Sequence, residues 1–104
     1  MWTFEAGLAW CCQANRLLLD HNVHTALTGS VLFKGSSEKD LDIIIYPHKT
    51  SCRIPFINEI CNILSLRFVE DRTNTHSRYS DSEHKKVYHT ETASGKRIDI
   101  FMLQ

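Results

Sequence analysis

The chain has 104 residues, which allows one modest hydrophobic core but not two, so we expect a single domain over residues 1–104. Apolar residues make up 42% of the chain and charged residues 23%, as is typical of a soluble globular protein. Twelve Lys and Arg residues balance twelve Asp and Glu residues, which argues against a global basic field that would bind nucleic acid or an anionic membrane.

Compartment and redox state follow from what the sequence lacks and from its cysteines. No stretch approaches the roughly 20 apolar residues of a membrane span, and the N-terminus lacks the pattern of a secretory leader, so we expect a cytoplasmic protein. Judged by their number alone, the four cysteines could form a disulfide framework. However, Cys11 and Cys12 are adjacent, and Cys12 and Cys61 fall on apolar faces of helix-like segments. Free thiols are therefore preferred over a disulfide framework.

The first half of the chain predicts one helix and two strands. Thr3 can cap a helix that runs to about Asp20, because apolar residues recur there at helical spacing. Val23 to Thr28 is a short predicted strand that leads into a turn at Gly29-Ser30. The clearest strand is Leu41 to Tyr46, and Pro47 ends it.

The second half predicts one helix and three strands. The helix opens at Thr50 or Ser51, with Pro55 in its first turn. The predicted segments after it are a strand at Arg67 to Glu70, a polar loop at Asp71 to Lys86, and a hairpin of Val87 to Thr92 with Lys96 to Leu103, joined near Ser94-Gly95. This order predicts an α/β or α+β fold, in which a small mixed sheet carries helices on one face.

Aspartates in two of these strands predict a cation site. Side chains alternate across a strand, so Asp40 and Asp42 share one face, with their Cα atoms about 6.6 Å apart. Two carboxylates at that separation can converge on one cation, or on two held roughly 3.5–4 Å apart. Asp99, between Ile98 and Ile100, repeats the alternation on a later strand.

The chemistry of these oxygen ligands favours Mg²⁺, with Mn²⁺ as a possible substitute, because Mg²⁺ needs few protein carboxylates and completes its coordination with water and phosphate oxygens. For Asp99 an alternative stays open, which is an ion pair with Arg97 or Lys96 at a sheet edge. A carboxylate–apolar–carboxylate triplet is common by chance, and the Gly29-Ser30 pair upstream makes this one more specific.

Gly29-Ser30, a spacer, Asp40-Leu41-Asp42 and the later Asp99 together resemble the signature of the nucleotidyltransferase superfamily that shares the DNA polymerase β palm. The resemblance covers Val23 to Leu103 and is closest to the minimal nucleotidyltransferases. It implies transfer of a nucleotidyl group from a nucleoside triphosphate to an acceptor hydroxyl on a small molecule, a protein or an RNA end.

The resemblance also implies a role for each matched residue. Gly29 and Ser30 would cradle the β- and γ-phosphates. Asp40 and Asp42 would hold the Mg²⁺ that bridges the triphosphate, and Asp99 would join them on a second ion and serve as the base. From proximity alone, the residues that could neutralise the departing pyrophosphate are Lys39, Lys96 and Arg97.

Other interpretations of the same residues stay open. The domain could be a non-catalytic nucleotidyltransferase-fold module, such as an antitoxin-like partner protein. A glycosyltransferase with a metal-binding Asp-x-Asp is disfavoured because the chain is too short for its usual nucleotide-binding domain. His21-x-x-His24 could ligate zinc and Cys52 could pair with His48, but no third ligand or orienting residue accompanies either pair.

The predicted helices suffice for one face of the sheet, which leaves the aspartate face to be covered in another way. Phosphoryl-type chemistry gains most from a partly dehydrated site. The polar loop at 71–86 could close over it, but it carries few apolar groups. We therefore expect a homo-oligomer or a partner protein to cover this face.

Overall fold

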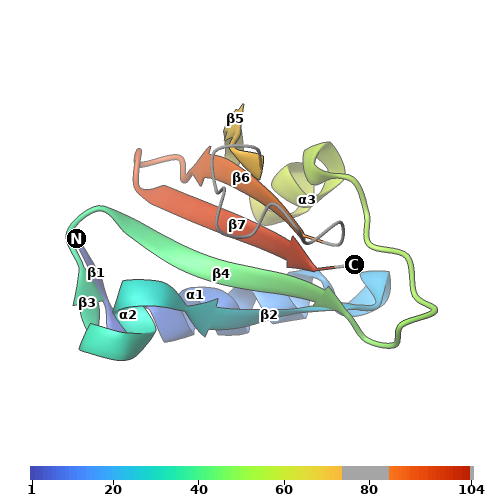
Figure 1. Cartoon of the computed structure of the whole chain (residues 1–104), viewed down its shortest axis with the longest axis horizontal. Coiled ribbons are helices and arrows are strands. Elements are labelled where there is room, and N and C mark those ends of the chain that lie inside the picture. The colour runs from blue at the N-terminus through green and yellow to red at the C-terminus, as the bar shows by residue number, and fades with distance from the viewer. Residues whose placement is uncertain (74–84, 104) are drawn as a thin grey trace.

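A computed structural model describes residues 1–73 and 85–103 of the chain, and in it a five-stranded sheet packs against helices (Figure 1). The elements in chain order are β1 (Trp2–Thr3), α1 (Phe4–Leu17), the 3₁₀ turn η1 (Leu19–His21), β2 (Val23–Thr28), α2 (Gly29–Lys34), β3 (Ser36–Ser37), β4 (Asp40–Pro47), α3 (Ile57–Leu64), β5 (Arg67–Asp71), β6 (Lys85–Glu91) and β7 (Arg97–Leu103). The predicted α+β class with a mixed sheet is confirmed.

The large sheet has the strand order β2-β4-β7-β6-β5, and β1 and β3 form a separate two-stranded sheet. Strands β4 and β7 are parallel, whereas the other neighbours in the large sheet are antiparallel. A parallel pair needs a long crossover, and here the chain between β4 and β7 supplies α3, β5 and β6. Strand β7 therefore lies at the centre of the sheet, with β4 beside it (Figure 1).

The core lies between the sheet and helices α1 and α3, which pack on the same face (Figure 1). The sheet contributes alternate residues of its two parallel strands, each at most 2% exposed: Leu41, Ile43 and Ile45 of β4, and Ile98, Ile100 and Met102 of β7. Burying such a side chain contributes about 1.5–3 kcal/mol. This burial sets the register, because a shift by one residue would turn the apolar residues outward and the aspartates inward.

Helix α3 buries the apolar face that its spacing predicts, whereas the predicted face of α1 is only partly correct. Cys11 and Leu18 are buried, but three other apolar residues counted on that face are exposed: Phe4, Leu8 and Leu19. The Thr3 side chain accepts a hydrogen bond from the Ala6 amide (3.1 Å) and caps α1, as predicted. Cys11 faces the core, whereas Cys12, which the apolar spacing placed on the buried face, is exposed. All four cysteines are free thiols, as preferred from the sequence. Within residues 1–73 and 85–103, each helix is too short or too polar to span a bilayer.

Helix α3 begins later than predicted. It starts at Ile57 with Phe56 as the N-cap, so Pro55 precedes the helix instead of lying in its first turn. A residue that precedes proline is disfavoured in the helical conformation, and here that residue is Ile54. The segment from Thr50 or Ser51 that was predicted as helix instead contains a turn, in which the Cys52 amide donates to the Lys49 carbonyl (2.8 Å).

Other boundaries also differ from the prediction. Helix α1 ends at Leu17 rather than near Asp20, and η1 follows it before Asn22 adopts a left-handed conformation (φ 57°). The short elements α2, β1 and β3 were not predicted. Strand β5 extends to Asp71 and strand β6 includes residues 85–86, all of which were assigned to the polar loop. Residues 74–84 of that loop lie outside the described residues.

Candidate metal centre

The three predicted aspartates meet where β4 and β7 begin. In the parallel register, Asp42 is the direct partner of Asp99, and Asp40 is the partner of Arg97. One carboxylate oxygen from each aspartate lies within 4.8 Å of the others, so a single metal ion could contact all three. The cluster lies on the sheet face opposite α1 and α3, as the alternation of side chains predicts. Asp99 is the most buried of the three, at 7% exposed.

Gly29 brings the start of α2 against this cluster. Its φ of +70° belongs to the left-handed region, which glycine adopts without the strain a side chain would cause. A Cβ at this position would overlap the Asp42 carboxylate and lie 2.8 Å from the Asp42 Cβ. The predicted Gly29-Ser30 turn is therefore in van der Waals contact with one of the aspartates, and only glycine permits that approach.

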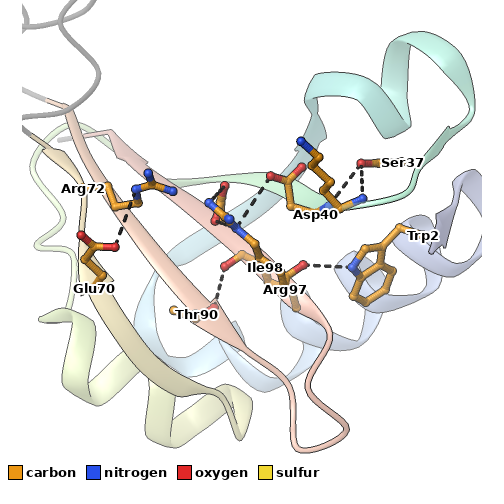
Figure 2. Close-up of polar contacts among 10 residues, drawn as sticks. Trp2, Ser37, Asp40, Glu70, Arg72, Thr90, Arg97 and Ile98 are labelled. Carbon is orange, nitrogen blue, oxygen red and sulfur yellow. Dashed lines mark hydrogen bonds and ion pairs between the residues drawn. The ribbon is translucent and has the colours of Figure 1, made fainter.

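Arg97 supplies positive charge within the cluster. Its guanidinium donates twice to Asp99, from Nε to Oδ1 (3.1 Å) and from Nη2 to Oδ2 (3.3 Å), and Nε lies 3.8 Å from Asp40 Oδ2 (Figure 2). The ion pair considered from the sequence is thus present, although on the central strand of the sheet rather than at an edge. With all three carboxylates ionised, Arg97 leaves two formal negative charges, which a divalent cation would balance.

Burial and the closeness of the carboxylates raise the pKa values of Asp40 and Asp42. Burial, followed by the negative charges of Asp40 and Asp99, raises the pKa of Asp42 to about 7. Burial and the neighbouring Asp99 also raise the pKa of Asp40, although the positive charges of Arg97 and Lys39 oppose this. A proton therefore competes with a cation for this site near neutral pH, because a carboxylate must be deprotonated to bind a metal.

Several hydrogen bonds hold the first residues of both strands in place. The Trp2 indole donates to the Arg97 carbonyl (2.9 Å), and the Asp40 amide donates to Ser37 Oγ (3.2 Å) (Figure 2). Lys96, the other cation considered for Asp99, instead lies over the Trp2 ring at 4.3 Å from its centroid. The sequence did not reveal the roles of Trp2 and Ser37, because both depend on contacts between segments whose pairing no local pattern indicates.

His89 is a further neighbour of the cluster that sequence reasoning missed. It is the cross-strand partner of Asp99 on β6, and direct partners in an antiparallel pair share a face. Its Nε2 is buried, and no hydrogen-bond partner for it occurs within the described ranges. Alternation along β6 could have placed His89 on the aspartate face only if the pairing with β7 had been known.

The two alternative histidine sites are not assembled as the sequence suggested. His24 Nε2 lies 2.8 Å from His48 Nδ1, so the ring that could have paired with Cys52 contacts His24 instead. His21 lies in η1 and is not part of that contact. The histidine pair that the fold creates therefore joins β2 to the segment after β4.

The acidic cluster and the mixed α+β fold are the features by which the protein can be classified. They define a small domain with a candidate divalent-cation site on the sheet face opposite α1 and α3. Comparison of the chain with models of known protein families finds no match, and neither does comparison with curated proteins. Functional inference therefore depends on the chemistry of this site and on the motif that surrounds it.

Proposed function

We propose that this protein is a Mg²⁺-dependent nucleotidyltransferase that moves a nucleotidyl group from a nucleoside triphosphate to an acceptor hydroxyl. The observation that carries the proposal is the convergence of Asp40, Asp42 and Asp99 within 4.8 Å, with Gly29 packed on Asp42. The order of these residues along the chain resembles the nucleotidyltransferase signature, and their contact in space supports that resemblance.

The donor set fits the proposed ion. Three carboxylates can bind Mg²⁺ and leave coordination positions for water and for phosphate oxygens, and Mn²⁺ accepts the same ligands. When bound, the ions would neutralise charge on the triphosphate and lower the pKa of the attacking hydroxyl. Asp99 is the candidate base for that hydroxyl because it shares the ligand cluster and is the most buried of the three aspartates.

Positive and polar groups around the cluster would bind the phosphates. The absence of a side chain at Gly29 lets a phosphate approach the backbone, and the Ser30 hydroxyl can donate to it. Lys39, which directly precedes Asp40, carries a positive charge close enough to lower the pKa of that carboxyl. Arg97 would neutralise pyrophosphate if a metal ion replaced it beside Asp99, because its guanidinium suits phosphate geometry.

One observation favours a second candidate function, that of a non-catalytic nucleotidyltransferase-fold module such as an antitoxin-like partner protein. Arg97 already supplies two hydrogen bonds to Asp99, so the cluster is partly neutralised without a metal ion. Three carboxylates in contact are nevertheless costly in a domain that does not use them, since like charges at this distance destabilise the fold. We therefore place the enzyme first.

Calorimetry tests the site, and product analysis tests the reaction. ATP and GTP are titrated with and without Mg²⁺, and we expect Mg²⁺-dependent binding that Asp42→Asn removes. Equal affinity under both conditions, unchanged in Asp42→Asn, would contradict the site assignment.

The protein is then incubated with labelled triphosphates and cell extract. Pyrophosphate release or a labelled acceptor that disappears in Asp40→Ala supports the enzyme, whereas Mg²⁺-dependent binding without turnover supports the module.

A cytoplasmic location is part of the same proposal. The four free cysteines, two of them buried, support a reducing compartment, where disulfides are rare. Nucleoside triphosphates are the proposed donors and would have to be present in the same compartment. Fractionation of the native source cells would test this, and recovery of the protein outside the cytoplasm would contradict it.

A further inference from the structure

Two histidine rings meet at the end of the aspartate face that is distant from the carboxylates. His24 lies on β2 and His48 directly follows β4, with His24 Nε2 2.8 Å from His48 Nδ1. Their ring centroids are 5.0 Å apart, and the ring planes make an angle of 62°. His48 is exposed and His24 is half-buried, so solvent and dissolved ions reach the pair.

The sheet holds both backbones in place. His24 is the cross-strand partner of Tyr46 in the antiparallel β2–β4 ladder. The His48 amide donates to the Asn22 carbonyl (2.8 Å), which extends the ladder past Pro47. The Tyr46 ring lies beside His24, with centroids 5.5 Å apart. The backbones of both histidines are therefore held in place by the sheet. Rotation of the side chains alone can orient the ring nitrogens toward a bound ion.

The separation of the nitrogens matches a metal chelate. Imidazole nitrogens bind first-row metals at about 2.0–2.1 Å, so two that occupy adjacent positions at right angles around one ion lie about 2.9 Å apart. The observed 2.8 Å is close to that value. Square-planar and octahedral coordination have such positions, and Ni²⁺ and Cu²⁺ favour nitrogen ligands in these geometries.

We propose that His24 and His48 form a binding site for a divalent transition-metal ion, with water completing its coordination. The site is distinct from the aspartate cluster, because Tyr46 lies four strand rises beyond Asp42 on β4, a distance of about 13 Å along the strand. The ligand chemistry also differs, since imidazole favours Ni²⁺, Cu²⁺ and Zn²⁺ whereas carboxylates favour Mg²⁺ and Mn²⁺. The site does not depend on the proposed nucleotidyl transfer.

A hydrogen-bonded histidine pair without a metal function is the competing explanation, and it predicts a different response to Ni²⁺. The experiment titrates Ni²⁺ by calorimetry into Cys12→Ser/Cys52→Ser protein at pH 7.5, where the more accessible thiols cannot compete. We expect His24→Gln and His48→Gln each to weaken Ni²⁺ binding at least tenfold. The matched control is His21→Gln, which removes a nearby imidazole outside the pair and leaves the affinity within twofold.

A second measurement locates the ion. Paramagnetic Ni²⁺ broadens backbone amide signals near its site, and we expect the first signals lost to come from residues 22–26 and 46–49. Asp42→Asn should leave both the broadening and the Ni²⁺ affinity unchanged. Broadening centred elsewhere in the chain, equal affinity losses in His21→Gln and His48→Gln, or loss of binding in Asp42→Asn would overturn the proposal.

Discussion

Gly29 shows how one residue can serve both the backbone and the site. Its positive φ and its contact with Asp42 each exclude a side chain, for different reasons. Gly35 also has a positive φ (83°), but a Cβ there would meet nothing within 4 Å. A substitution at Gly35 therefore measures the cost of backbone strain alone, whereas one at Gly29 adds the cost of steric overlap with Asp42.

We expect Gly29→Ala to destabilise the protein more than Gly35→Ala. Both changes impose the strain of a left-handed residue, about 1–2 kcal/mol, but only the first also displaces Asp42. Denaturant unfolding of both variants measures the difference. Mg²⁺ affinity should fall in Gly29→Ala and stay unchanged in Gly35→Ala. Equal effects of the two substitutions on stability would show that the contact with Asp42 is unimportant.

Asp42 should make the metal-free protein less stable as pH rises. Its folded-state pKa of about 7 lies above the ordinary value, so the folded state binds more protons than the unfolded state between about pH 4 and 7. Stability is therefore lost as pH increases through that range. Because Asp42 is only partly buried, we put the penalty on the order of 1 kcal/mol.

Asp42→Asn should remove this penalty. In the absence of metal at pH 8, we expect the variant to melt about 4–8 °C above the unsubstituted protein, and the difference should shrink towards pH 4. Added Mg²⁺ should raise the melting temperature of the unsubstituted protein but not that of Asp42→Asn. Scanning calorimetry across pH measures both effects. A metal-free variant that melts below the unsubstituted protein at pH 8 would mean that Asp42 stabilises the fold.

At the scale of elements, the N-cap of α1 combines a local signal with a tertiary role. Thr3 caps the helix through its side chain and also belongs to β1, where it pairs with Ser36. We expect Thr3→Ala to lower the free energy of unfolding by about 1 kcal/mol, the usual value of such a cap. Thr50→Ala is the control, because Thr50 is exposed and lies outside the helices. A smaller loss in Thr3→Ala than in Thr50→Ala would contradict the capping role.

The start of α3 shows where local pattern misleads at this scale. The helical spacing of Ile57, Ile60, Cys61 and Leu64 predicts one apolar stripe, and in the structure the last three are buried and Ile57 is half-buried. The polar residues before it resemble a helix start, but Pro55 restrains the residue that precedes it and delays the first turn to Ile57. Periodicity identifies which face of a helix is buried, whereas chain geometry near proline decides where the helix begins.

At the scale of the molecule, helices α1 and α3 occupy one face of the sheet (Figure 1). Because side chains alternate along β4 and β7, the aspartates lie on the other face. We predict that a second subunit or a partner protein covers the aspartate face, since the proposed chemistry gains from excluding water. Light scattering should therefore show a species larger than the 12.0 kDa chain, alone or after addition of the partner. A strict monomer that turns over nucleotide efficiently on its own would make this prediction wrong.

Much of the local architecture follows from sequence alone. Alternation along residues 40–46 and 97–103 determined that the aspartates oppose the apolar core, and Ser94-Gly95 marked the turn between β6 and β7. The class of fold and the presence of the three carboxylates on one face could likewise be predicted. These features depend on the alternation of side chains along a strand and on the exclusion of charged groups from the core. Both can be recognised from residues that are close together in the sequence.

The tertiary structure alone decided which segments meet. The parallel pairing of β4 with β7 sets Asp42 opposite Asp99, and the same register places Arg97 within reach of both Asp40 and Asp99. The His24–His48 contact and the position of His89 beside Asp99 arise in the same way. Strand order and register depend on contacts between residues far apart in the chain, and no local period of the sequence encodes them.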